Sequence, residues 1–271
     1  MTTANASPPT YVTSADGTRI AYWTTGEGPP LVLVHGTTAD HTRWAPVMPY
    51  LEPYFTVHAI DRRGRGESGD AADYAVGREY EDVAAVVEAV ATGTRTAVNL
   101  LGHSFGGTCA FGAATRTSHL RRLVLYEGWP RPHPEKIALP ADVRQRMEDL
   151  LSAGDREAVL EVFFREIVRM PEDEFVAYRA LPVWQARIAA AHTIAREEPQ
   201  LLDAAEAGRV TVPVLMLVGG DSPAAMQGDH ETVAAVLPDA RVSILEGQQH
   251  IAIDRVPKVF AQRVVEFLLE R

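Results

Sequence analysis

The sequence predicts an α/β protein built on a mostly parallel sheet, and three observations support this fold class. Short runs rich in Val, Leu and Ile alternate with segments of helical periodicity along most of the 271 residues. The runs are apolar at consecutive positions, which is typical of strands that helices bury on both faces. About 46% of the residues are hydrophobic and 23% are charged, so the chain can bury one large core in one domain or two at most.

Six apolar runs are expected to form the strands of this sheet. They are residues 31–36, 55–61, 96–102, 120–128, 212–220 and 240–247. Helices are expected between the runs. Valines recur at spacings of three and four across residues 79–91, and Val, Phe and Leu repeat that spacing across residues 256–268. Each of these helices should pack one face on the sheet.

The chain divides into a folded core and an insertion. Residues 1–9 are small, polar and contain proline, so they are expected to form a mobile N-terminal segment. The core should comprise residues 10–130 and 210–271. Residues 131–209 hold no clear strand run and carry helix-ending prolines, so we expect a helical cap insertion of about four short helices.

Charge and composition exclude several classes of function. Lys and Arg number 26 and Asp and Glu 36, a formal net charge of −10, which would repel nucleic acids and anionic membrane surfaces on average. No apolar run approaches the roughly 18 to 20 residues of a membrane span, and the start MTTANASPPT lacks the features of a secretion signal. The single cysteine, Cys109, excludes an internal disulfide. We expect a cytoplasmic monomer or homodimer that binds a small-molecule substrate, with no nucleic-acid or membrane partner.

The strongest local motif is the sequence GHSFG at residues 102–106, which directly follows the apolar run 96–102. A G-x-S-x-G between a strand and a helix forces the serine into a tight turn that projects its hydroxyl from the sheet edge. The glycines leave room for neighbouring backbone. Ser104 is therefore the predicted nucleophile. The alternative is a glycine-rich turn that only joins a strand to a helix.

A serine hydroxyl is a weak nucleophile and needs a base, which a carboxylate orients. His250 is the best-placed base, because it lies in the loop between the last predicted strand and the last helix, at the carboxyl edge of the sheet. The side chain of His103 should diverge from the nucleophile and pack in the core. His35 should support loop geometry by a backbone hydrogen bond. The other six histidines have no comparable placement and lack the spacing of a metal site.

Two carboxylates compete to orient His250. Asp221 follows the run 212–220 and completes the chain order serine, acid, histidine, so it is the preferred partner. Glu127 lies at the end of the run 120–128 and is the competitor, because its strand should neighbour the nucleophile strand.

Two backbone N–H groups should stabilise the oxyanion that forms when the serine attacks a carbonyl. One belongs to Phe105, directly after the nucleophile, where the positive end of the following helix assists. The other belongs to Thr37 in the loop after the run 31–36, with Thr38 as the alternative if the turn is one residue longer. The sequence has no phosphate-binding glycine loop, dinucleotide fingerprint or metal-ligand cluster, so no cofactor or metal is predicted.

Five segments in this order together resemble the α/β-hydrolase family, and the resemblance runs from about Tyr11 to the C-terminus. They are His35-Gly36-Thr37-Thr38, the sequence DRRGRGES at 61–68, the sequence GHSFGG at 102–107, Gly219-Gly220-Asp221 and Gln249-His250. The resemblance implies an α/β-hydrolase fold, with an eight-stranded, mostly parallel sheet flanked by helices and a helical cap inserted after the sixth strand. The segment 61–68 resembles a loop of the family whose charged residues we interpret as structural.

Departures from particular branches narrow the prediction. A serine rather than an aspartate at position 104 is unlike epoxide hydrolases and haloalkane dehalogenases, and no H-G-G-G run of the hormone-sensitive-lipase branch is present. We expect a serine hydrolase, most simply a carboxylic ester hydrolase, that cleaves a small to medium, largely apolar ester, lactone or thioester through an acyl-enzyme intermediate. The apolar residues that could line its substrate pocket are Trp129, Trp184 and Met226, with Phe163, Phe164 and Met170.

Other reactions remain open on the same residues. They are C–C bond hydrolysis, perhydrolase- or haloperoxidase-like chemistry, and lyase chemistry, which direct product assays separate from ester hydrolysis. A low-turnover ligand-binding homologue is a further alternative. Tight ligand binding without turnover over a broad panel of esters would favour it.

Overall fold

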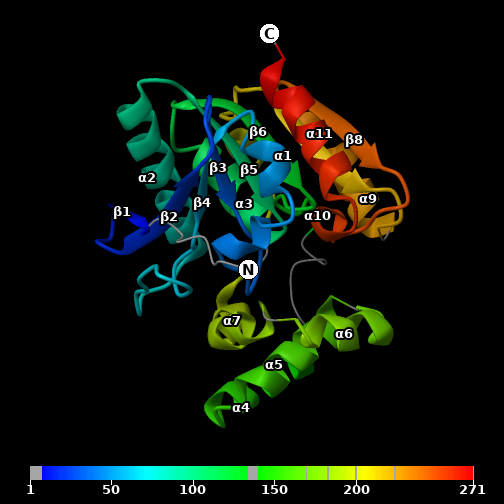
Figure 1. The fold of residues 1–271 in the computed structure, drawn as a ribbon. Helices are drawn as coiled ribbons and strands as arrows, with labels where there is room; N and C mark the ends of the chain where they lie inside the picture. Colours follow the sequence, from blue (N-terminus) through cyan, green and yellow to red (C-terminus); the bar gives the residue numbers. More distant parts are fainter. Residues whose placement is uncertain are drawn as a thin grey trace.

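The structure, a computed structural model, describes residues 8–133, 140–168, 170–181, 183–198, 200–222 and 224–270, without the side chains of residues 173, 174 and 224–228. Its centre is an eight-stranded sheet in the order β1-β2-β4-β3-β5-β6-β7-β8 (Figure 1). Helices cover both faces. The predicted α/β fold with an eight-stranded, mostly parallel sheet is therefore confirmed.

Each of the six predicted runs contains a strand, and a hairpin of two further strands precedes them. The strands are β1 (Thr10–Thr13), β2 (Arg19–Thr25), β3 (Pro30–Val34), β4 (Thr56–Ile60), β5 (Val98–His103), β6 (Leu120–Tyr126), β7 (Val214–Gly219) and β8 (Ala240–Leu245). β2 is antiparallel to β1 and to β4, and all other neighbouring pairs are parallel. The parallel strands therefore end at one common edge of the sheet.

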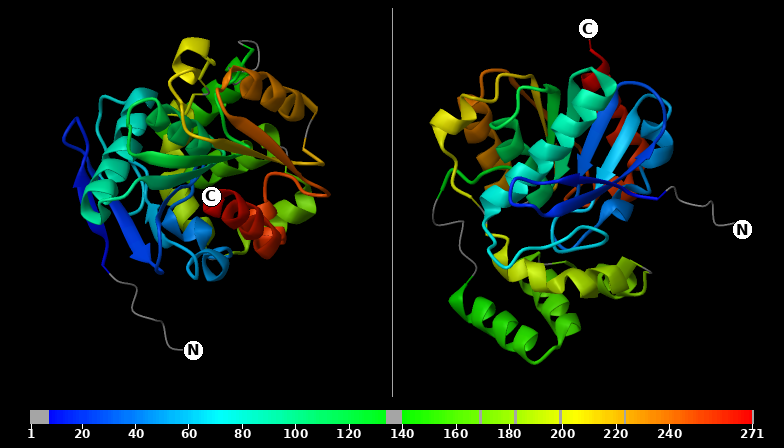
Figure 2. Two further views of the ribbon diagram at one scale, coloured as in Figure 1. Left: turned by 90° about the horizontal axis from the view of Figure 1, so that it is seen from above. Right: turned by 90° about the vertical axis from the view of Figure 1, so that its left-hand side faces the viewer.

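The helices of the core form two layers, one on each face of the sheet (Figure 2). They are the short 3-10 helix η1 (His41–Trp44), α1 (Met48–Leu51), α2 (Val76–Thr94), α3 (Phe105–Ala114), α9 (Ala224–Val236), α10 (Ala252–Arg255) and α11 (Pro257–Leu269). Buried residues of α2, α3 and α9 pack with Val32 and Val34 of β3. Those of η1, α1, α10 and α11 pack with Leu31 and Leu33. Successive residues of the strand thus enter opposite cores, which explains its uninterrupted apolar sequence.

The predicted helical spacing matches the buried faces of α2 and α11, with one exception. The four valines of α2 that set its pattern are all buried. In α11 the buried residues include Phe260, Val264 and Leu268. Val259, which the pattern places on the same face, is 49% exposed. Pro257 stands in the first turn of α11, where its missing N–H costs no helical hydrogen bond.

Between β6 and β7 the chain forms a separate helical layer, seen below the sheet in Figure 1 and apart from it in the right-hand view of Figure 2. Its elements are α4 (Ala141–Ser152), α5 (Arg156–Val162), the π-helical turn η3 (Phe163–Ile167), α6 (Glu172–Arg179), α7 (Val183–Ala190) and the 3-10 helix η4 (Ala191–Arg196). The short helix α8 (Ala204–Ala207) lies on the return to β7, and its buried Ala207 packs in the main core. A bridge between Arg131 and Leu201 joins the outgoing and returning chain.

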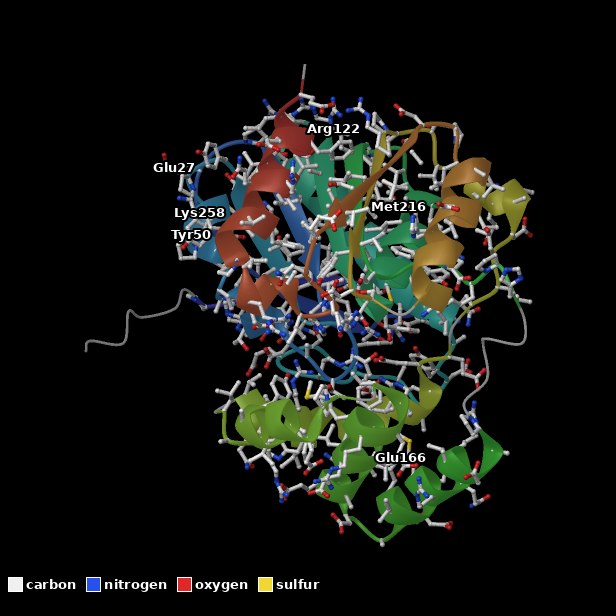
Figure 3. All side chains as sticks on the ribbon, turned by 90° about the vertical axis from the view of Figure 1, so that its right-hand side faces the viewer. Glu27, Tyr50, Arg122, Glu166, Met216 and Lys258 are labelled. Carbon is white, nitrogen blue, oxygen red and sulfur yellow. The ribbon has the colours of Figure 1, made fainter. Side chains whose placement is uncertain are left out.

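This layer has its own apolar core, which includes Met147, Leu160, Phe164, Phe175 and Trp184. Figure 3 shows side chains within the layer and between the sheet and its helices, with Met216 inside the main core and Glu166 on the helical layer. We propose residues 131–209 as a cap on a core made of residues 10–130 and 210–271. Of the expected N-terminal segment 1–9, residues 1–7 lie outside the described residues.

Within the part of the chain that the structure describes, the helices lack the length and apolar character needed to span a membrane.

Candidate active site

Ser104 occupies the turn between β5 and α3, in the strand–turn–helix setting that its motif predicts. Its backbone dihedral angles are φ 56° and ψ −132°, a conformation that costs free energy for a residue with a side chain. Close packing holds the turn. A Cβ atom on Gly106 would lie 2.2 Å from the carbonyl oxygen of His35, and one on Gly128 would lie 1.7 Å from the carbonyl oxygen of Ser104. Only glycine fits at these two positions, so the surrounding backbone fixes the serine.

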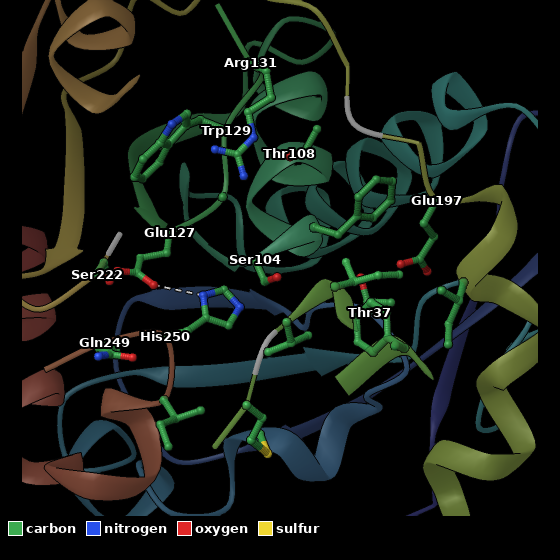
Figure 4. A pocket seen from close by; sticks show the side chains of 18 of the residues that line it. Thr37, Ser104, Thr108, Glu127, Trp129, Arg131, Glu197, Ser222, Gln249 and His250 are labelled. Atoms are coloured by element: carbon green, nitrogen blue, oxygen red, sulfur yellow. Dashed lines mark hydrogen bonds and ion pairs between the residues drawn. The ribbon is translucent and has the colours of Figure 1, made fainter. Parts of the chain in front are cut away.

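His250 lies in the loop between β8 and α10, and its imidazole is hydrogen-bonded to a carboxylate. The distance from Nδ1 of His250 to Oε2 of Glu127 is 2.9 Å. In Figure 4 the imidazole is seen between the side chains of Glu127 and Ser104. His250 and Ser104 line the same cavity. The two residues predicted as nucleophile and base are therefore brought to one site.

Glu127 follows β6 directly, with φ 44°, and its carboxylate is fully buried. It accepts hydrogen bonds from the His250 imidazole, from the backbone N–H of Gly219 at 2.8 Å and from the hydroxyl of Ser222. Burial alone would raise the pKa of Glu127, but the bonds from His250, Ser222 and Gly219 outweigh it and hold the pKa below its ordinary value. Glu127 is thus held as a carboxylate beside the imidazole.

The preference for Asp221 as the partner of His250 is corrected by this geometry. Asp221 lies beyond the end of β7 and is exposed, and its backbone N–H donates to the carbonyl oxygen of Gln248 at 3.0 Å. His250 is instead hydrogen-bonded to Glu127, the competing carboxylate. The turn after β6 directs the Glu127 side chain to the end of β7, where it accepts a bond from Gly219. Ser222, next to Asp221, supplies the hydroxyl that supports Glu127, a contact that the sequence did not reveal.

The two predicted oxyanion donors lie on the wall of the cavity that Ser104 lines. The N–H of Phe105 is at the first position of α3, and Thr37 follows the end of β3 by three residues. Within the described part of the chain, neither N–H donates a hydrogen bond to a protein acceptor. Thr38, the alternative, is 1% exposed and does not line the cavity. The arrangement leaves the N–H groups of Thr37 and Phe105 available to a ligand.

A cap residue that the sequence analysis missed contacts this turn. Nη1 of Arg187, from α7, donates to the carbonyl oxygen of Thr37 at 3.2 Å and to Oγ1 of Thr38 at 2.7 Å. The Thr38 hydroxyl itself donates to the Thr37 carbonyl at 2.7 Å. Thr38 adopts φ 58°, and these bonds hold it there. No local motif marks Arg187, so only the folded structure connects it with the site.

His35 and His103 support the site without acting as its base. Nδ1–H of His35 donates to the carbonyl oxygen of Gly36 at 2.9 Å, while Nε2 accepts from the N–H of Arg62 at 3.1 Å. The predicted backbone hydrogen bond of His35 is confirmed. His103 stacks on Tyr126 with ring centroids 4.9 Å apart, and its Nε2–H donates to the carbonyl oxygen of His250 at 3.0 Å. Burial, followed by the positive field of neighbouring groups, lowers the pKa of both rings well below the ordinary value, so both stay neutral.

The segment 61–68 lies behind the site and is held by buried ion pairs, as its structural interpretation predicts. Arg62 binds Glu79 at 2.8 and 2.7 Å and also binds Glu197 at 2.9 Å. The guanidinium of Arg62 lies 4.7 Å from the ring centroid of Phe105. Arg65 forms a second ion pair with Glu197, which lies just after η4 of the cap. These pairs connect the cap with the loop that supports α3.

The cavity over Ser104 and His250 has a volume of about 540 Å³ (Figure 4). Its apolar lining includes Phe105, Trp129, Phe163, Ile167, Met170 and Ile194. A smaller cavity of about 110 Å³ shares Ser104 and His250 with it and is also lined by Arg187. Among the described residues, no group of three or more His, Cys, Asp and Glu side chains could hold a metal ion.

The structure confirms only part of the predicted pocket lining. Trp129 lines the larger cavity. Trp184 lines neither, because its ring packs inside the cap against Phe164 and Phe175 and its indole N–H donates to Glu157 at 3.0 Å. The placement of Trp184 in the pocket is therefore corrected. The side chain of Met226 lies outside the described part of the structure.

Comparisons with known proteins agree with this fold. A model of the family described as "Alpha/beta hydrolase family" matches residues 31–263. A curated relative in Acinetobacter baylyi, named (E)-2-((N-methylformamido)methylene)succinate hydrolase, is 27% identical over 91% of this chain and 93% of its own length. A solved alpha/beta hydrolase from Sphaerobacter thermophilus is 34% identical with a TM-score of 0.83, covering 96% of this chain and 100% of that one. A solved esterase from Rhodococcus sp. is 26% identical with a TM-score of 0.73, covering 96% and 98% respectively.

Proposed function

Because the chain belongs to the alpha/beta hydrolase family, we propose that it is a serine hydrolase that cleaves an ester, lactone or thioester through an acyl-enzyme intermediate on Ser104. The observation that carries the proposal is the hydrogen-bonded pair of His250 and Glu127 on the wall of the cavity that Ser104 also lines. The similarity to proteins named as hydrolases and esterases supports the same class of reaction.

The hydrogen bond to Glu127 assigns the proton of the neutral imidazole. A carboxylate only accepts hydrogen bonds, so Nδ1 of His250 carries the proton and Nε2 keeps a free lone pair. In the proposed first step, Nε2 takes the hydroxyl proton of Ser104 while Oγ attacks the acyl carbonyl carbon. Glu127 stabilises the imidazolium that results and keeps the ring oriented.

The negative charge that develops on the carbonyl oxygen needs donors that are already in place. In the proposal these are the N–H groups of Thr37 and Phe105, with the positive end of α3 behind the second. The imidazolium of His250 then gives its proton to the leaving group, and the acyl-enzyme forms. A water molecule that His250 activates in the same way releases the acid and restores Ser104.

The shape of the cavity supports an acyl compound of small to medium size. Its volume of about 540 Å³ lies in the range of roughly 300 to 1,000 Å³ that is usual for small-ligand pockets. Phe105, Trp129 and Ile194 provide apolar surface for the part of the substrate that is not cleaved.

Replacing Ser104 by Ala tests the proposal directly. With 4-nitrophenyl esters of increasing acyl length, kcat of Ser104→Ala should fall by about 10⁴-fold or more, because the nucleophile is lost. Ser118→Ala, at an exposed serine after α3, is the matched control and should keep the activity of the unmodified protein. Equal turnover by the two variants would refute the proposed function.

A further inference from the structure

Arg187 is a buried cation beside the candidate nucleophile. The residue belongs to α7 of the cap and is 7% exposed. It lines the smaller cavity together with Ser104 and His250. Its hydrogen bonds to the described residues go from Nη1 to the carbonyl oxygen of Thr37 and the hydroxyl of Thr38. Among the described residues it forms no ion pair with a carboxylate.

These contacts leave Arg187 without a directly paired anion in the described part of the chain. The two oxygen atoms that it binds are neutral, and Nε is buried with no hydrogen-bond partner among the described residues. Burial, the largest effect, lowers the pKa of the Arg187 guanidinium. Arg43 acts in the same direction, and the opposing effects of Tyr178, Asp40 and Asp254 do not outweigh the two. Arginine nevertheless stays protonated in proteins. A buried cation without an anion is unfavourable unless a ligand supplies one.

The other charged residues that line the two cavities are already paired. The pairs are Arg43 with Asp254 at 2.8 Å, Arg131 with Asp229 at 3.3 Å, Glu197 with Arg62 at 2.9 Å, and His250 with Glu127 at 2.9 Å. Arg187 is therefore the one lining cation, within the described part of the chain, that lacks an acidic partner. The unmatched positive charge lies next to the reacting atoms.

The surroundings of Arg187 fit a carboxylate. The planar guanidinium forms paired hydrogen bonds with the two oxygens of a carboxylate. Tyr178 stands beside it, with 5.1 Å between Cζ of Arg187 and the ring centroid, and burial raises the pKa of Tyr178, so its hydroxyl remains a donor. The smaller cavity, of about 110 Å³, exceeds the space that one water molecule requires by several-fold and has room for such a group.

We propose that Arg187 forms a carboxylate-binding subsite, so that the substrate carries an anionic carboxylate close to the acyl group that Ser104 attacks. This inference rests on the proposed function, since it names the substrate class of the same site. It differs from the expectation of a largely apolar substrate. Half-esters of short dicarboxylic acids combine the two groups in one molecule, with any apolar remainder in the larger cavity.

Matched substrates test the subsite. One series consists of the monomethyl esters of succinic, glutaric and adipic acids, and the other of methyl keto-esters of the same lengths in which a methyl ketone replaces the carboxylate. The unmodified protein should prefer at least one half-ester by about tenfold or more in kcat/KM. Arg187→Met should remove this preference mainly by raising KM, and Arg187→Lys should keep part of it because the charge remains.

Arg179→Met is the matched control, because Arg179 is a cap arginine that is 45% exposed and paired with Glu157 and Glu161. It should leave the preference unchanged. If no half-ester is preferred, or if Arg187→Met lowers kcat/KM equally for both series, the subsite is refuted. Equal lowering would mean that Arg187 only holds the Thr37–Thr38 turn.

A binding measurement separates failure of the subsite from failure of the proposed function. Calorimetric titration of Ser104→Ala protein with glutarate, and with glutaramide as the neutral control, requires no turnover. Glutarate should bind and glutaramide should not. The double variant Ser104→Ala, Arg187→Met should bind glutarate about tenfold or more weakly than Ser104→Ala does. Such binding in a protein that turns over no ester would support the subsite and refute the hydrolase mechanism. Ester turnover without glutarate binding or half-ester preference would refute the subsite alone.

Discussion

At the scale of single residues, Glu127 links the end of the sheet to the proposed catalytic groups. The residue adopts φ 44° immediately after β6, and its carboxylate receives hydrogen bonds from Gly219, Ser222 and His250. Three donors around one buried carboxylate hold it in a single orientation. The imidazole that this carboxylate binds is therefore also oriented, which is the requirement for proton transfer from Ser104.

Replacing Glu127 by Gln should reduce kcat for an activated ester by about 10⁴-fold, because an amide can favour the wrong tautomer of His250 and does not stabilise the imidazolium. Asp221→Asn is the matched control at the exposed carboxylate and should change kcat by less than about twofold. Steady-state kinetics of the two variants, with circular dichroism to verify folding, decide the assignment. A large loss for Asp221→Asn and a small one for Glu127→Gln would reverse it.

The sequence could place both carboxylates near the base, but chain order favoured Asp221, which is not the one that binds His250. Glu127 and Asp221 each follow a predicted strand, and parallel strands bring their ends to one edge. Which side chain reaches His250 depends on the dihedral angles of the one or two residues after each strand. Those angles are set by contacts with the neighbouring strand end, such as the bond from Gly219, and no local pattern encodes them.

At the scale of elements, β4 carries a buried histidine whose protonation opposes folding. His58 is 6% exposed, its Nδ1 shares a hydrogen bond of 2.9 Å with Oγ1 of Thr24 in β2, and its Nε2 has no partner among the described residues. Burial lowers the pKa of His58 from its ordinary 6.5 to about 4. The folded state therefore holds the ring neutral where the unfolded chain would protonate it.

The free energy of unfolding should depend on pH through His58. Between its unfolded pKa of 6.5 and its folded pKa of about 4, the unfolded chain binds more protons, so stability is full above pH 6.5 and falls as the pH is lowered. From pH 7.5 to pH 5 this group should account for a loss of about 2 kcal/mol. His58→Gln cannot titrate. Urea denaturation should show that the stability difference between the unmodified protein and this variant falls by that amount, and parallel pH profiles would contradict the account.

Most elements of the sheet could be predicted because burial on both faces leaves a continuous apolar run. The exceptions are at the edges. β8 was predicted from such a run, yet Val242 and Ile244 are each 38% exposed because no strand lies beyond it. The β1–β2 hairpin lies at the other edge, where only part of β2 is buried, and the residues alone did not predict it. Edge strands bury too little surface to show a strong pattern.

At the scale of the whole molecule, distant parts of the chain form the candidate site. Ser104 comes from the turn between β5 and α3, Glu127 from the end of β6, His250 from the loop after β8, and Arg187 from the cap. Ser104, Glu127 and His250 lie together because the parallel strands that precede them end at the same edge of the sheet. The sequence could predict Ser104 and His250 because residues that follow parallel strands meet at this edge. No comparable rule holds for the cap, because its helices can pack with different side chains facing inward. Trp184 was therefore placed wrongly in the pocket, and Arg187 was missed.

We propose that folding makes Ser104 nucleophilic by bringing His250 and Glu127 to it. Labelling with an alkyl fluorophosphonate, followed by peptide mapping in a mass spectrometer, tests this proposal. The native protein should carry one label on Ser104, and the label should be absent from His250→Ala protein and from native-sequence protein unfolded in guanidinium chloride. A label on another residue, or equal labelling of Ser104 in the native, His250→Ala and unfolded samples, would contradict it.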